Sequence, residues 1–368
     1  MINKIFSIGF LILYANINLS LAQTVDLTSV DEFFKVTLTL KLGKEISEKQ
    51  WNDFDISSGY KGFAESENKF IINTIKTSIN IVFGNGKKSE KESILSISNV
   101  DMLNNKTLLL KKLILTNYLE INKNYDSIKS FRKNYDFNAL IEKAKQKLSS
   151  FLGTPIDSTT EFKPVYFLFI NADGKDADNA IYIDFTLIYK MTEEQRMNFL
   201  AHEFFHNYRR KYENHDFNYK SDLNFIIDMI QNEGIADQID KTEGFVNYYN
   251  NVMKSPELAK IMMNLYNQAE EDLEIFQNII VKYSKSKISE KETIDQILEV
   301  YKFNGHHIGY YMSNQIVKAG YKNEMIITFY NPYEFYSLYN KAAKGQNIFR
   351  LNDEFMNYLE DITREYYR

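Results

Sequence analysis

The 368-residue chain contains no cysteine and few residues that break helices, with 4 prolines and 14 glycines. The lack of cysteine excludes disulfides, thiolate zinc sites, iron–sulfur clusters and a cysteine nucleophile, so any transition-metal site must use histidine, aspartate or glutamate. Because glycine and proline are scarce, the composition disfavours an all-β sandwich or propeller. The sequence predicts a mostly helical protein.

A large excess of charge of one sign is also absent. The chain has 44 Lys and Arg against 49 Asp and Glu, a formal net charge of −5, and no long basic run interleaves with aromatic residues. This pattern disfavours a nucleic-acid partner. No segment has the roughly 20 uncharged apolar residues that a bilayer span needs, so we expect no membrane span in the mature chain.

The amino terminus has the pattern of a secretory signal peptide. Lys4 supplies a positive charge, residues 5–14 are an apolar run, and Ser20-Leu21-Ala22 presents small residues at both positions that a signal peptidase reads. We expect cleavage after Ala22 and a secreted or periplasmic mature protein. A buried amino-terminal helix or an uncleaved anchor is the alternative interpretation.

Hydrophobic periodicity predicts an α+β fold that is predominantly α-helical. Apolar residues recur three and four apart before about residue 156 and again in the last third of the chain, whereas 165–170 and 180–185 are β-branched and aromatic runs typical of strands. The expected domains are a signal peptide (1–22), an N-terminal helical region (23–156), a catalytic core (157–240) and a C-terminal helical subdomain (241–368).

Two of only five histidines stand four residues apart in His202-Glu203-Phe204-Phe205-His206. A capping box that begins at Thr192 places them inside a helix, where residues i and i+4 share a face and two imidazoles can bind one Zn²⁺. Glu203 points beside the same position and can accept a proton from water as a general base. The alternative is a chance pair of histidines in an unrelated helix.

A catalytic zinc usually has three protein ligands, so a third is expected elsewhere. The metzincin spacing is rejected because Arg209 and Tyr212 occupy its glycine and histidine places. Glu233 and Asp237 lie four apart on a predicted helix, so one carboxylate can bind the metal while the other holds a ligand imidazole from behind. The substitute candidates are His215, Asp222 and Asp228.

With Asn232-Glu233-x-x-x-Asp237 after the two-histidine helix, the sequence resembles the gluzincins, the thermolysin-like zinc peptidases. The resemblance covers roughly residues 180–237 and implies a zincin-like core, in which a short sheet accompanies the two-histidine helix and a glutamate helix. It implies that His202, His206 and Glu233 bind zinc, that Glu203 is the base and that Asp237 orients His202. The chain is also similar to uncharacterised bacterial families of zinc-dependent peptidases.

The same resemblance implies an oxyanion donor from the downstream region. On a helix His307 and Tyr311 share one face, and His306 and Tyr310 the next. We assign the donor role to His307 and Tyr311; core packing is the alternative for either tyrosine.

The resemblance also implies that residues 178–183 form an edge strand that pairs with an extended peptide. The acidic residues between 171 and 178 lack EF-hand spacing, which favours a polar turn over a Ca²⁺ site.

Together these features predict a secreted zinc metallopeptidase that hydrolyses peptide or protein substrates with zinc-activated water and Glu203 as the general base. The alternative is a non-catalytic binding or scaffold protein of the cell envelope that retains a zincin-like core. Digestion of a mixed peptide library with and without a chelator distinguishes the two.

Overall fold

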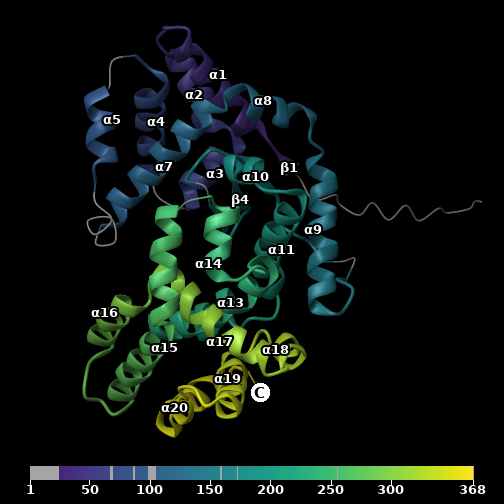
Figure 1. The fold of residues 1–368 in the computed structure, drawn as a ribbon, viewed down its shortest axis with the longest axis vertical. Helices are drawn as coiled ribbons and strands as arrows, with labels where there is room; N and C mark the ends of the chain where they lie inside the picture. The colour runs from purple at the N-terminus through teal and green to yellow at the C-terminus, as the bar shows by residue number, and fades with distance from the viewer. Residues whose placement is uncertain are drawn as a thin grey trace, which may run out of the picture.

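A computed structural model describes residues 25–66, 69–85, 88–97, 105–157, 160–171, 173–254 and 256–367. The predicted signal peptide lies outside these ranges. In the described residues a small sheet lies between two groups of helices, the N-terminal group at one end of the molecule and the C-terminal group at the other (Figure 1). The fold is therefore α+β and predominantly helical, as the sequence predicts.

The N-terminal group begins with a short strand, β1 (Val25–Asp26), and α1 packs its buried aromatic residues against the sheet; Phe33 lies 4.3 Å from Phe169 between ring centroids. Gly153 caps the carboxyl end of the helix α9 (Phe137–Leu152), and its φ of +69° is the left-handed conformation that glycine adopts without strain. The helices of this group are α1 (Thr28–Lys41), α2 (Glu48–Ile56), α3 (Ser58–Ser66), α4 (Lys69–Phe83), α5 (Lys88–Leu95), α7 (Lys106–Lys123), α8 (Tyr125–Asn134) and α9 (Phe137–Leu152).

The sheet has the order β1-β2-β4-β3, in which β1, β2 and β4 are parallel and β3 is antiparallel to β4. The strands β2 (Val165–Leu168) and β4 (Ile181–Asp184) confirm the two predicted strands. Every residue of β4 is buried because β4 lies between two neighbours and under helices. The expectation that residues 178–183 form an edge strand is therefore wrong; that edge belongs to β3 (Gly174–Asp176).

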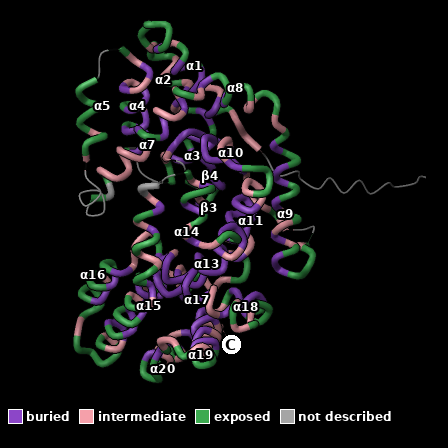
Figure 2. The backbone as a smooth tube through the Cα atoms, in the orientation of Figure 1, coloured by how far each residue is buried: buried purple, intermediate pink, exposed green. Residues whose placement is uncertain are grey.

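The remaining helices follow the sheet, and α13 and α17 are buried along most of their length (Figure 2). The predicted capping box between Thr192 and Gln195 starts α11. One apolar core extends through the three regions predicted for the mature chain, whose boundaries remain predictions. The elements are α10 (Phe185–Lys190), α11 (Glu193–Arg209), α12 (His215–Lys220), α13 (Asp222–Asp240), α14 (Phe245–Asn247), the π-helix η1 (Tyr248–Val252), α15 (Pro256–Ser284), α16 (Glu290–Val300), the 3₁₀-helix η2 (Phe303–Gly305), α17 (His306–Lys318), α18 (Lys322–Ile327), α19 (Pro332–Gln346) and α20 (Asp353–Thr363). Within the described ranges no helix is both long and apolar enough to cross a bilayer.

Candidate metal centre

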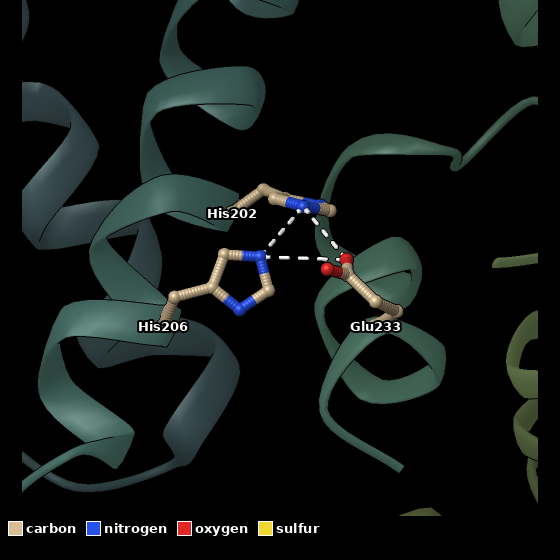
Figure 3. Close-up of side chains that lie close together, drawn as sticks. All are labelled: His202, His206 and Glu233. Carbon is tan, nitrogen blue, oxygen red and sulfur yellow. Dashed lines mark hydrogen bonds and ion pairs between the residues drawn. The ribbon is translucent and has the colours of Figure 1, made fainter. Parts of the chain in front are cut away.

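The structure brings together the side chains of His202, His206 and Glu233. The two histidines project from one face of α11 toward Glu233 on the neighbouring helix α13 (Figure 3). Their Nε2 atoms lie 3.0 Å apart, and Glu233 Oε2 lies 3.7 Å from the Nε2 of His202 and 3.5 Å from that of His206. Three ligand atoms this close can surround one ion.

Hydrogen bonds behind the two histidines orient their rings so that each Nε2 faces Glu233. His206 Nδ1 lies 3.0 Å from Asn232 Oδ1, and His202 Nδ1 lies 3.1 Å from Asp240 Oδ1. Because both partners are oxygen acceptors, each Nδ1 donates, which leaves Nε2 as the ring atom that can bind an ion when the imidazole is neutral. Glu233 Oε2 is buried and has no hydrogen-bond partner among the described residues. Such an arrangement of acceptors is costly unless a cation satisfies it.

The three substitute ligands do not join His202, His206 and Glu233. Asp228 accepts hydrogen bonds at 2.9 and 2.5 Å from the buried guanidinium of Arg209. His215 is 58% exposed and pairs with Glu213 at 3.5 Å, and Asp222 is the first residue of α13. None of them belongs to a cluster close enough to hold a metal among the described residues.

We call the side chains of His202, His206 and Glu233 the metal cluster. Glu203 is 5% exposed and lies between this cluster and β3. A Cβ on Gly174 of β3 would come 2.5 Å from Glu203 Oε1, so glycine at this position leaves the room that the carboxylate occupies. Burial raises the pKa of Glu203 to about 8, and the negative charges of Asp173, Asp176 and Glu233 act in the same direction. A positive charge at the cluster would lower it again.

The two histidines differ in their electrostatic surroundings. Burial lowers the pKa of His206, which favours the neutral imidazole that a metal ligand requires. Burial acts in the same direction on His202, but the carboxylate of Asp240 outweighs it and raises the pKa of His202 to about 9. Asp240 is thus the dominant charge behind His202.

The sequence assigns the partner of His202 to Asp237, but the nearer carboxylate is that of Asp240. Asp237 Oδ1 lies 3.7 Å from His202 Nδ1, against 3.1 Å for Asp240 Oδ1. Both oxygens of Asp237 lie 3.1 Å from Nδ1 of His306 instead. Asp240 was not identified from the sequence as the partner of His202. Helical spacing could have indicated it, because Asp240 follows Glu233 by seven residues, which is two turns along the same face.

His306, rather than His307 or Tyr311, reaches the metal cluster. Its Nε2 lies 3.4 Å from Glu233 Oε2, and its side chain is 22% exposed and lines the cavity described below. His307 is fully buried and bonds Asp272 at 3.0 Å. The Tyr311 hydroxyl donates to Glu270.

Both acidic partners lie on α15, so the face of α17 that carries His307 and Tyr311 packs against that helix. Neither residue lines the cavity. His307 and Tyr311 therefore face α15 and not the cavity, so neither is placed to donate to an oxyanion there.

A cavity of about 710 Å³ opens onto the metal cluster, within the range of sites that enclose small ligands. One wall includes the β3 residues Gly174, Lys175 and Asp176. The N-terminal helices contribute Phe63, Ile71 and Leu110, and the segment around η1 contributes Tyr248, Tyr249 and Met253. Residues from all three predicted regions of the mature chain thus surround the same space.

Two carboxylates near β3, those of Asp176 and Asp178, are paired with cationic side chains. Asp176 lies 3.0 Å from Lys163 and 2.8 Å from Arg210, and Asp178 lies 2.8 Å from Arg210. The clusters that could hold a metal in the described part of the chain do not include these residues. A polar turn stabilised by ion pairs accounts for this segment.

Two histidines and a glutamate beside a ligand-sized cavity, with a further buried carboxylate alongside, are side chains that could hold a metal ion. The chain belongs to the family described as "Putative zinc dependent peptidase (DUF5700)", whose sequence model matches residues 51–347, well over half of the chain. That span contains the whole metal cluster. No curated protein and no solved structure matches the chain.

Proposed function

We propose that the protein is a secreted zinc peptidase in which His202, His206 and Glu233 hold the metal. The observation that carries the proposal is the convergence of two Nε2 atoms on a buried glutamate oxygen that lacks a hydrogen-bond partner among the described residues. Zinc bound there would supply a Lewis acid that lowers the pKa of water and polarises a substrate carbonyl.

Glu203 is the general base in this proposal. It follows the first histidine on α11, is buried beside the cluster, and does not belong to a set of candidate ligand atoms. A carboxylate in this position can take the proton from the attacking water and deliver it to the leaving amine.

His306 takes the place of His307 and Tyr311 as the candidate donor to the oxyanion. Its ring faces the cavity from α17, and Asp237 fixes its orientation through Nδ1. Its protonated ring could donate from Nε2, which lies 3.4 Å from Glu233 Oε2, to the carbonyl oxygen of a bound substrate.

The antiparallel edge strand β3 is the surface that suits a peptide backbone. Its residues line the cavity next to Glu203, and the strand has no pairing partner on its outer side among the described residues. An extended peptide that adds to this edge would gain main-chain hydrogen bonds and lie alongside the base. Cleavage after Ala22 would leave β1, which starts at Val25, intact.

Digestion of a mixed peptide library by the zinc-loaded mature chain tests the proposal. We expect new peptide termini in the zinc-loaded sample, loss of cleavage after treatment with a chelator, and recovery when zinc is restored. Zinc binding without cleavage of any library peptide would contradict the peptidase and support the non-catalytic scaffold protein.

A further inference from the structure

We propose that Lys241 is a positioning residue that joins the two sides of the candidate active site. It holds the carboxylates of Asp240 and Asp237, and through them orients His202 on one side and His306 on the other. The inference rests on the proposed function in one respect, that His202 is a metal ligand.

The ammonium of Lys241 lies in the interior, directly after the last residue of α13. The residue is 4% exposed. Its Nζ is 2.5 Å from Asp237 Oδ1 and 3.3 Å from each oxygen of Asp240. Both carboxylates are buried, and no other lysine or arginine in the described ranges forms an ion pair with either.

Each carboxylate reaches a different histidine. Asp240 accepts from His202 Nδ1 and Asp237 from His306 Nδ1, both at 3.1 Å. His202 belongs to α11 and His306 to α17, whereas the two carboxylates and the lysine belong to α13 and its carboxyl end. Three side chains from one helix end therefore link two other helices at the cavity.

Lys241 is needed because two buried carboxylates this close repel each other. Removing one partner of a buried ion pair leaves uncompensated charge and is typically strongly destabilising. The carboxylates and histidines also form two further clusters that could hold a metal. Because the ammonium already contacts the Asp237 carboxylate that both clusters share, we assign no second ion to them.

Aromatic side chains fix Lys241 from the other side. Its Nζ lies 4.5 Å from the ring centroid of Tyr248, within cation–π distance. The hydroxyl of Tyr310 donates to the Lys241 carbonyl at 3.5 Å. The lysine is thus confined by groups from η1, α13 and α17, which suits a residue that sets the position of others.

The test measures zinc binding and histidine environment, so it needs no peptide hydrolysis. Lys241→Met keeps the aliphatic stem and removes the ammonium. We expect a zinc dissociation constant raised 10–100-fold, the range typical of losing a group that orients a ligand. Lys285→Met, which removes an exposed lysine paired with Glu354, is the control and should bind zinc as the wild type does.

A second comparison separates positioning from charge balance, because Lys241→Met also lowers folding stability. In the double variant Lys241→Met/Asp237→Asn, positions 237, 240 and 241 together have the same net charge as in the wild type, and Asp240 is kept. Asp237→Asn alone keeps both Lys241 and Asp240. We expect near-normal zinc affinity in Asp237→Asn and a dissociation constant 10–100-fold higher in the double variant.

Spectroscopy reports on both histidines directly. In protein labelled with ¹⁵N-histidine and freed of metal, the ring nitrogen signals of His202 and His306 should shift in Lys241→Met and stay in place in Lys285→Met. The cobalt-substituted protein should show a changed visible spectrum in Lys241→Met only.

Wild-type zinc affinity and unshifted ring signals in the Lys241 variants would overturn the inference and leave the peptidase standing. A wild-type protein that binds no zinc would instead contradict the proposed function itself.

Discussion

Gly234 and Gly309 are in backbone contact where α13 crosses α17. A Cβ on Gly234 would lie 2.4 Å from the carbonyl oxygen of Gly309, and a Cβ on Gly309 would lie 2.8 Å from the amide nitrogen of Gly234. Glu233 adjoins the first glycine, and His306 lies almost one turn before the second. The close crossing is what allows His306 to reach Glu233.

Gly309→Ala should therefore force the two helices apart. Overpacking of this kind typically costs about 1–3 kcal/mol of unfolding free energy, and displacement of His306 should also lower peptide hydrolysis. Gly345→Ala is the matched control, because nothing lies within 4 Å of a Cβ there in α19. It should stabilise the protein by about 0.5–1 kcal/mol. Equal stability of the two variants in chemical denaturation would show that the crossing tolerates a methyl group.

Glu203→Gln should strongly reduce peptide hydrolysis without removing the metal. The substitution keeps the size of the side chain and leaves the three proposed ligands in place. We expect zinc content and thermal stability close to wild type, with peptide hydrolysis reduced by about 10²–10⁴-fold, as is typical for a positioned acid–base group. Glu194→Gln, at an exposed position of the same helix, should be as active as the parent. A fully active Glu203→Gln protein is incompatible with the proposed base.

Glu233→Ala should weaken zinc binding by more than the 10–100-fold typical of losing an outer partner, because it removes a proposed ligand. His215→Ala should not change zinc binding, since this exposed ring pairs with Glu213 rather than with the cluster. Titration of the metal-free protein measures both dissociation constants and the expected stoichiometry of one zinc per chain. The reverse order of effects would mean that the third ligand has been misassigned.

Asp240→Asn and Asp237→Asn should have different consequences. Asp240 is the nearer partner of His202, so its variant should bind zinc about 10–100-fold more weakly. Asp237 orients His306, which is not a proposed ligand, so its variant should keep zinc and lose turnover. Zinc affinity and kcat measured on both variants decide this, and equal losses of affinity would assign Asp237 to His202 as well.

The mature chain should begin at Gln23, because Ser20-Leu21-Ala22 follows an apolar run of signal-peptide type. Intact-mass measurement on protein recovered from its native host tests the cleavage. A mass that retains residues 5–14 would contradict secretion by this route.

The parts of the site that local sequence could predict are those that lie within one helix. The spacing of His202 and His206 fixes their common face whatever surrounds them, and a capping box fixes where their helix begins. The same reasoning predicted that Glu233 shares a face with a second carboxylate. The continuous β-branched and aromatic runs at 165–170 and 180–185 likewise predicted β2 and β4.

What local sequence could not predict depends on contacts between distant elements. Whether Asp237 or Asp240 faces His202 is decided by how α13 lies against α11, since both residues share the face of Glu233. The choice between His306 and His307 is decided by the crossing at Gly309, which turns one histidine toward α13 and the other toward α15. The edge position of β3 follows from its antiparallel pairing with β4. A strand of three residues is too short to give a hydrophobic pattern from which this pairing could be predicted.

Among the described residues, both outer strands of the sheet are very short. β1 has two residues and β3 has three, and the Asp176 end of β3 carries the charged groups of Lys163 and Arg210. Short, charged edges are how natural sheets avoid templating strands from other copies of the same chain. Outer strands this short disfavour extensive pairing between copies of the chain, and a peptide that pairs with β3 could do so over only about the three residues of that strand.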